Sequence, residues 1–329
     1  MLPNTNFIIN SKNLLEFFNK FRICGLNFND LLKNIKKDEL KMNKLLTLFN
    51  INITLFYELL KIISSKYIGN DRHFIYCFEY NLILILHVKN NLNNWKILQS
   101  LIICHNNYKS IYNQFLRWTK KNIFKTAYEN NIFKNVNIIN EIHDVLIDAT
   151  SINNKYGSEN VTINPEYTKK NVTKMSVITT TNKFIIGITP FKLNKKKIIY
   201  NKNEKIINTF EHDSKTIQRT INNINKKIKI NNIIGDGGYK TTVEIKSNNK
   251  IINIITPNRK NQINKLNNNE EKIKLKIRYR VENVFGSLKL NNERIMLRKD
   301  RCLTTFMSWF YIGCLEHNIK IDIKQKIKL

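Results

Sequence analysis

Apolar positions follow a helical spacing in one part of the chain and a strand-like pattern in another. Within residues 108–125, apolar side chains recur at roughly helical intervals: Ile111, Phe115, Trp118 and Ile123. This spacing predicts an amphipathic helix. Residues 144–152 (DVLIDATSI) instead form a short apolar run rich in β-branched residues, which predicts a strand.

The part of the chain after residue 144 predicts alternating strands and helices. The predicted elements after 144–152 are two hairpin strands in MSVITTTN and KFIIGITPF that meet at Thr181-Asn182, a helix over 214–229 capped by Ser214, a strand and glycine turn in NNIIGDGGY, a short helix, a strand in IINIITPN and one long helix over 272–290. This order predicts an α/β fold in which a mixed sheet carries helices on its faces.

Two short helices are predicted ahead of the sheet and resemble a helix-turn-helix. The first is WKILQSLIICHN (95–106), and a polar turn joins it to the helix in residues 108–125. In that motif the second helix enters the major groove of DNA. Its basic face, which includes Arg117, Lys120 and Lys121, would then bind DNA. A plain helical bundle with a solvated basic face explains the same periodicity.

Breaker residues mark the division between the two parts. Glycine and proline are rare before residue 144 and frequent between 144 and 290, so the first part is expected to be helical and the second to contain turns between strands. We therefore expect two domains. The first is a helical N-terminal region over 1–143, with its helix-turn-helix-like segment at about 94–128, and the second is an α/β domain over 144–320.

The chain is strongly basic, with 55 Lys and Arg residues against 25 Asp and Glu residues and a net charge of +30. Such a charge favours polyanionic partners, nucleic acid first and an anionic membrane surface second. The longest purely apolar run, residues 82–86, is far shorter than the about 20 residues of a membrane span, and the N-terminus lacks the pattern of an export signal. Five scattered cysteines without a CxxC pair fit reduced thiols, which predicts an intracellular protein.

Three acidic residues occupy positions where a sheet of this kind would place a site. Asp148 ends the first apolar strand, Asp236 ends a later strand before Gly237-Gly238, and Glu282 lies on the long helix. Ligands gather beyond strand ends in open α/β sheets, and converging carboxylates need a cation to stay ionised. Oxygen-only ligation favours two magnesium or manganese ions. Taken singly, the acids also fit two turn residues and a solvent-facing helix residue.

The helix over 272–290 adds two cations to this pattern. Four apolar residues of the helix form a stripe that should face the core: Ile277, Val281, Val284 and Leu288. Arg278, Glu282 and Lys289 form another stripe roughly 120° away. A carboxylate between two cations on one face suits a phosphate backbone.

Arginine is scarcer than lysine, so its placement is more informative. Six of the ten arginines lie between residues 259 and 301. We expect Arg294 and Arg298, from the C-terminal end of this segment, to hold backbone phosphate, which would make DNA affinity sensitive to salt.

The spacing Arg278-x3-Glu282-x6-Lys289 resembles the Y-x2-R-x3-E-x6-K signature of bacterial insertion-sequence DDE transposases, in their large four/five-type branch. Other segments resemble motifs of that family in the same order: IDATSI, HDSKTI, IIGDGGYKT and ITPNRKNQ. The resemblance covers most of the chain, from about residue 95 to 320. It implies a ribonuclease H-like catalytic core, with Asp148, Asp236 and Glu282 as the metal-binding triad for two magnesium or manganese ions.

By the same match, Arg278 and Lys289 would bind the DNA backbone or the transposon end. The resemblance thus implies a transposase that cleaves transposon-end DNA and transfers the freed 3′-hydroxyl into target DNA. It further implies inverted repeats and target DNA as partners, and a homodimer that joins two ends. The protein would be DNA-associated, in a cytoplasm or nucleoid, or in a nucleus or viral factory.

One departure from the family keeps two alternatives open. Leu275 stands where the signature has tyrosine, and residues 1–90 match no part of the family. The first alternative is therefore a catalytically inactive or domesticated DNA-binding protein derived from a transposase. The second is a ribonuclease H-like nuclease without strand transfer.

Overall fold

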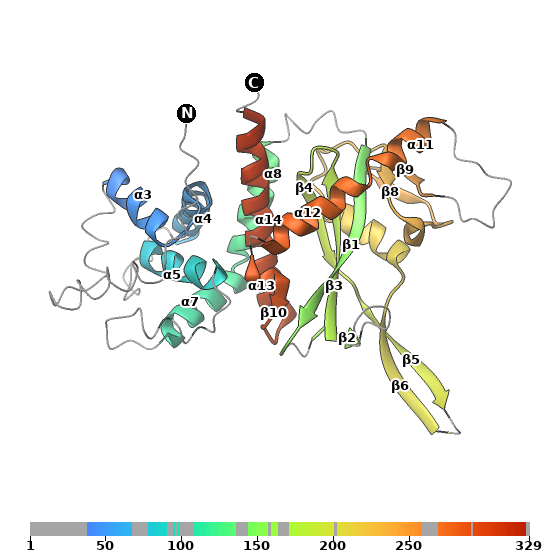
Figure 1. Ribbon diagram of the computed structural model, residues 1–329, viewed down its shortest axis with the longest axis horizontal. Coiled ribbons are helices and arrows are strands. Elements are labelled where there is room, and N and C mark those ends of the chain that lie inside the picture. Colours follow the sequence, from blue (N-terminus) through green and yellow to red (C-terminus); the bar gives the residue numbers. More distant parts are fainter. Residues whose placement is uncertain are drawn as a thin grey trace. The chain divides into compact units, whose positions relative to one another are not determined.

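A computed structural model describes residues 38–67, 78–90, 95, 98, 108–135, 144–156, 159–163, 171–200, 203–257, 269–290 and 292–326 (Figure 1). The chain divides into two compact units, Met1–Ala127 and Tyr128–Leu329. The first unit is helical wherever the structure describes more than single residues, and the second holds the sheet.

The first unit is a group of short helices packed around one fully buried helix. Its helices are α3 (Glu39–Leu48), α4 (Ile53–Lys66), α5 (Phe78–Asn90), α7 (Lys109–Lys120) and the start of α8 (Ile123–Lys134). Side chains cap two of them, since Asp38 accepts a hydrogen bond from the Lys41 N–H and Asn52 accepts one from the Leu55 N–H. Helix α5 is buried from Tyr80 to Lys89 and packs against α4 and α7.

The helix predicted in residues 108–125 is two helices. Asn122 adopts a left-handed conformation, with φ of 54°, which ends α7 and lets α8 begin at the next residue. The predicted apolar face of α7 is confirmed, because Ile111, Phe115 and Trp118 are all buried. The first helix of the expected helix-turn-helix lies outside the described residues, apart from Trp95 and Leu98.

None of the helices in the described ranges is both long and apolar enough to cross a membrane by itself. Helices α3 and α4 have the length and apolar composition of a membrane span only when taken together, and the angle between them is 114°.

The second unit contains one mixed sheet of eight strands. They are β1 (Asp144–Asn154), β2 (Thr162–Ile163), β3 (Asn171–Thr180), β4 (Ile185–Pro190), β7 (Asn232–Ile234), β8 (Ile245–Ser247), β9 (Lys250–Ile255) and β10 (Leu297–Arg298). The central order is β4-β3-β1-β7-β9, in which β3 runs antiparallel to β1 whereas β7 and β9 run parallel to it. A separate hairpin of β5 (Leu193–Tyr200) and β6 (Asn203–Phe210) extends from this sheet (Figure 1).

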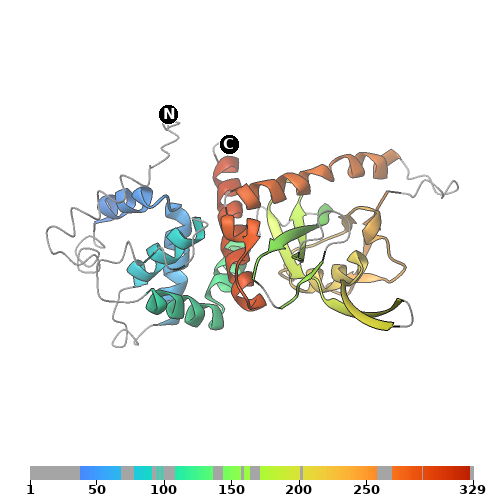
Figure 2. The same ribbon diagram turned by 60° about the horizontal axis from the view of Figure 1, so that its bottom comes forward.

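Helices cover both sides of the sheet. They are η3 (Asp213–Thr216), α10 (Ile217–Asn222), η4 (Gly237–Tyr239), α11 (Asn269–Lys276), α12 (Tyr279–Leu290), α13 (Glu293–Met296) and α14 (Leu303–Lys326). Helix α10 packs on β3 and β4, and α12 packs on β1 from the opposite side (Figure 2). The expected α/β class, a mixed sheet with flanking helices after a helical N-terminal region, is confirmed.

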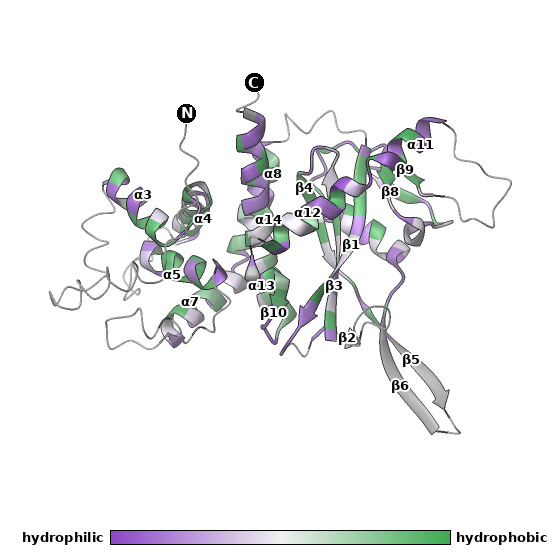
Figure 3. Cartoon of the chain, in the orientation of Figure 1, coloured by the Kyte–Doolittle hydropathy of each residue, from purple (hydrophilic) through white to green (hydrophobic). Residues whose placement is uncertain are grey.

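The core follows the apolar runs of the sequence. Val145, Leu146 and Ile147 of β1 are fully buried, as expected for a central strand with helices on both sides. Figure 3 shows hydrophobic residues along the strands in the centre of the unit and hydrophilic residues toward the ends of α11 and α14. The predicted hairpin of β3 and β4 is confirmed, and it turns through Thr181 and Asn182.

Several predicted helices are shorter than expected. The helix over 214–229 ends at Asn222, because the asparagine-rich segment that follows it forms turns. Its first turn is capped by His212, whose side chain accepts the Ser214 N–H, rather than by Ser214. The helix over 272–290 is interrupted by a turn at Ile277 and Arg278. The glycine turn itself forms the single 3-10 turn η4, and the short helix expected after it is absent, because residues 240–244 lead directly into strand β8.

Asn318 of α14 ties the edge strand β4 to the helix layer. Its side chain accepts a hydrogen bond from the Ile185 N–H and donates one to the Ile185 carbonyl, both at 2.8 Å. Asn318 is fully buried. We expect Asn318→Ala to lower the free energy of unfolding by about 2 kcal/mol, because the Ile185 N–H loses its partner. Urea unfolding measures this, and Lys324→Ala, at an exposed position of the same helix, should change it by less than about 0.5 kcal/mol.

Candidate active site

Two of the three predicted acids lie beside the carboxyl end of β7, because β1 and β7 are parallel neighbours. Leu146 pairs with Ile234 in this register. Asp148 lies two residues further along β1, in the middle of that strand and not at its end as predicted, because β1 continues to Asn154 in pairing with β3. Asp236 lies two residues beyond Ile234, the last residue of β7. Since adjacent strands lie about 4.8 Å apart, the two carboxylates come close to each other, and the charge of Asp236 acts on Asp148.

Asp148 is the most strongly perturbed acid of this site. Burial raises its pKa from 3.8 to about 6, against the effect of a hydrogen bond from the Ala149 N–H. The nearby charges of Asp236 and Glu282 raise the pKa of Asp148 further, and the charge of Arg278 lowers it. All three predicted acids are therefore close enough to interact electrostatically.

An ion pair with Arg278 links Glu282 to the site. The interruption of the helix at residues 277–278 leaves the Arg278 guanidinium between two acids, with Nη2 3.2 Å from Glu282 Oε1 and Nη1 3.7 Å from Asp148 Oδ2. The structure thus brings Arg278, in the turn before α12, together with Glu282 of α12, next to Asp148. The Glu282 side chain is 56% exposed, so it is open to a partner in solution.

Lys289 does not join this group. Its ammonium donates a hydrogen bond to the Ser151 carbonyl of β1, at 3.2 Å, and burial lowers its pKa. Ser151 lies three residues beyond Asp148 on the strand, so Lys289 fastens the last turn of α12 to β1. Leu275, at the position of the family's tyrosine, is half-buried on α11, and an exposed tyrosine, Tyr279, follows four residues later.

Asp236 is held by the glycine turn that follows it. Its Oδ1 accepts a hydrogen bond from the Gly238 N–H at 2.9 Å. A Cβ atom on Gly238 would lie 3.1 Å from that same oxygen and 2.8 Å from Asp213 Oδ2. A Cβ atom at position 238 would therefore force at least one of these carboxylates to move, whereas a Cβ atom on Gly237 would meet nothing within 4 Å.

The oxygen donors of the site suit a hard divalent ion such as magnesium or manganese. Within the described ranges, however, no three His, Cys, Asp or Glu side chains form a group that could hold a metal ion. Arg278 instead pairs with Asp148 and Glu282. The carboxylates fit the ion by their chemistry, and its binding would replace the ion pairs with Arg278.

Arg294 and Arg298 lie inside the second unit rather than on its surface. Arg298 is completely buried and donates hydrogen bonds to backbone carbonyls of Glu159, Asp300 and Arg301 and to the Thr173 hydroxyl. Arg294 is 3% exposed and stacks over the Trp309 ring. Neither guanidinium is accessible to a DNA phosphate in this structure.

The basic residues of α7 are exposed, as the amphipathic pattern predicts. Arg117, Lys120 and Lys121 all lie at the surface of the first unit, away from the buried side of the helix. The Lys121 ammonium also lies 3.9 Å from the centre of the Tyr67 ring, a favourable cation–π contact.

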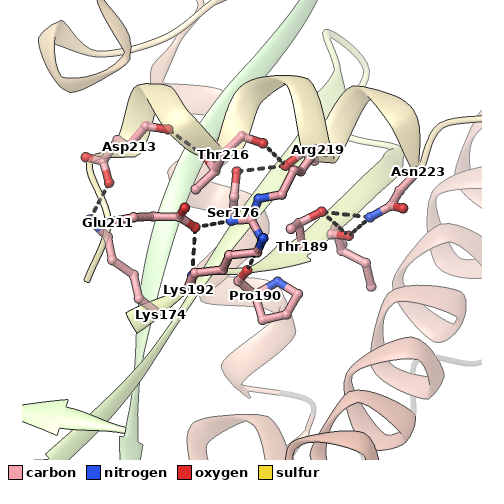
Figure 4. A network of polar contacts seen from close by, with 12 residues as sticks. Lys174, Ser176, Thr189, Pro190, Lys192, Glu211, Asp213, Thr216, Arg219 and Asn223 are labelled. Atoms are coloured by element: carbon pink, nitrogen blue, oxygen red, sulfur yellow. Dashed lines mark hydrogen bonds and ion pairs between the residues drawn. The ribbon is translucent and has the colours of Figure 1, made fainter. Parts of the chain in front are cut away.

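A polar network beside the site was not predicted (Figure 4). Arg219 pairs with the buried Glu211, which also accepts the Lys192 N–H at 2.7 Å. In the same network, Lys174 of β3 pairs with Asp213 of η3 at 2.5 Å. The resemblance of HDSKTI to a family motif drew attention to this segment. The sequence carries no signal, however, that Asp213 lies next to Asp236.

Tyr239 is the other residue that the sequence did not assign to the site. It is fully buried. Burial raises its pKa well above the usual value, and the charges of Asp213, Asp148 and Asp236 raise it further. The phenol therefore lies close enough to these three carboxylates to interact with their charges.

No protein-family model matches this chain, and no curated protein matches it. Among solved structures, the cryo-EM structure of a piggyBac transposase synaptic complex with hairpin DNA matches 82% of this chain and 72% of that chain. The identity is 10% and the TM-score is 0.41.

The raised pKa of Asp148 predicts a pH-dependent cost to stability. An unfolded Asp148 ionises near pH 3.8, but the folded one ionises near pH 6, so this carboxyl makes the fold less stable as the pH rises from about 4 through 6. We expect Asp148→Asn to raise the free energy of unfolding by about 2–3 kcal/mol at pH 8 and by less than about 1 kcal/mol at pH 4. Urea unfolding at both pH values tests this, and an equal effect at the two would contradict the assignment.

Proposed function

We propose that this protein is a DDE transposase that cleaves transposon-end DNA and joins the freed 3′-hydroxyl to target DNA. The observation that supports this most directly is the register of β1 and β7, which brings Asp148 near Asp236 where β7 ends. Glu282 interacts with both the Asp148 charge and the Arg278 guanidinium there. The order of these acids along the chain is also that of the family that the sequence resembles.

Each residue of the site has a distinct proposed role. Asp148, Asp236 and Glu282 would hold two magnesium or manganese ions, which when bound supply Lewis-acid activation of water and phosphate. Arg278 would contact the phosphate of the strand that is cut, because its guanidinium already lies among the carboxylates. Lys289 keeps α12 on β1 and so keeps Glu282 beside the strand ends.

The proposed reaction has two displacements at phosphorus. Water first attacks the phosphodiester at the transposon end, and the 3′-oxygen leaves as a hydroxyl after taking up a proton. That hydroxyl then attacks a target phosphodiester, so that one P–O bond forms as another breaks and no nucleotide cofactor is consumed. Positioning of the DNA strand would supply most of the protein's contribution to the rate.

The direct test is a cleavage and joining assay with labelled DNA ends and magnesium. We expect Asp148→Asn and Asp236→Asn each to lower product formation by at least about 1,000-fold, because each removes a carboxylate charge that stabilises the transition state. DNA binding should persist in both. Glu244→Gln, at an exposed residue of the same unit, is the matched control and should cleave normally.

Other outcomes of this assay favour the other candidates. Unchanged cleavage by Asp236→Asn would contradict the assignment of the acids. Tight binding by the wild-type protein without cleavage would favour an inactive DNA-binding protein, an alternative supported by Leu275 and by the pairing of Arg278 with two of the acids. Nicking without joined products would favour a nuclease.

The basic face of α7 supports a separate proposal, that the first unit binds DNA through phosphate contacts. We expect simultaneous alanine substitution of Arg117, Lys120 and Lys121 to weaken DNA binding and to reduce the slope of log affinity against log salt by about 2–3. Fluorescence anisotropy across a salt series measures both quantities.

A matched control removes the same charge from other helices of the first unit. Lys44, Lys61 and Lys66 are exposed on α3 and α4. Their simultaneous replacement by alanine should leave the salt slope near that of the wild-type protein. Equal losses in both triple variants would show that net charge, rather than the α7 face, drives binding.

A further inference from the structure

A fourth carboxylate, Asp213, lies next to Asp236 in the second unit. Both side chains contact Gly238, where a Cβ atom would lie 2.8 Å from Asp213 Oδ2 and 3.1 Å from Asp236 Oδ1. The turns η3 and η4, which carry these residues, pack against each other. The charge of Asp213 also acts on the buried Tyr239.

Local hydrogen bonds hold Asp213 in this position. The Thr216 hydroxyl donates to the Asp213 carbonyl at 2.7 Å, and the His212 side chain caps the same turn. Asp213 therefore belongs to a hydrogen-bonded turn, and its side chain is only 21% exposed.

Lys174 supplies the positive charge that this carboxylate needs. Its Nζ lies 2.5 Å from Asp213 Oδ1 and 4.6 Å from the centre of the Phe191 ring (Figure 4). Lys174 stands on β3 opposite Ser151 of β1. Without this ammonium, two carboxylates against one glycine would repel each other.

We propose that Asp213 and Lys174 are positioning residues for Asp236: Lys174 neutralises Asp213, and the Asp213 carboxylate packs on Gly238 and fixes the turn that orients Asp236. This inference rests on the proposed function, which makes Asp236 a ligand of a divalent ion. Partners that orient a ligand typically contribute about 10–100-fold to metal affinity.

The test measures Mn²⁺ binding to the full chain by electron paramagnetic resonance, which does not depend on cleavage. We expect Asp213→Asn to weaken Mn²⁺ binding about 10–100-fold, because the amide no longer compensates Lys174 and the ammonium repels the ion. The double variant Asp213→Asn with Lys174→Met has no uncompensated charge and should recover at least about 3-fold of that loss. A merely structural role predicts that the double variant binds no better than the single one.

Glycine variants test the close approach of the two carboxylates. Gly238→Ala should weaken Mn²⁺ binding because its Cβ atom would push Asp213 away from Asp236, whereas Gly237→Ala should bind as the wild-type protein does. Glu244→Gln controls for the loss of one surface charge, and circular dichroism confirms that each variant is folded.

The outcomes separate this inference from the proposed function. If Asp236→Asn leaves Mn²⁺ binding unchanged, Asp236 is not a metal ligand and the proposed function is wrong. Asp213 and Lys174 then have no metal ligand to position. If Asp236→Asn abolishes binding but Asp213→Asn does not weaken it, only the positioning role is overturned.

Discussion

The parallel pairing of β1 with β7 is the constraint on which the candidate site depends. Side chains alternate between the two faces of a strand, so a shift of one residue in this register would move Asp236 to the face opposite Asp148. The register is held because Val145 and Leu146 are buried together with Ile233 and Ile234. The hydrophobic core of the sheet thus determines where two polar groups meet.

Carboxylates at this site are tolerated because cations approach them from two sides. Arg278 comes from the turn before α12 and pairs with Asp148 and Glu282. Lys174 comes from β3 on the other side and pairs with Asp213. A half-buried carboxylate without a partner would be costly, so these pairs let the fold keep its acids charged in a small region.

Burial also decides which basic residues are available to a polyanion. Arg298 is enclosed because it satisfies backbone carbonyls of Glu159 and Arg301, which belong to different segments of the chain. Such an arginine stabilises the junction of several loops. Its neighbour in the sequence, Arg301, is exposed, and nothing in the local pattern distinguishes the two.

The sequence by itself determined the strand that carries Asp148 and the apolar face of α7, because these depend on spacing within one element. Only the tertiary structure decided that Lys289 turns to β1, that Arg298 is enclosed and that Asp213 meets Asp236. These features depend on partners 40 or more residues away or on the packing of separate turns. Periodicity reports the face of an element, but not which distant backbone group or charge will lie against it.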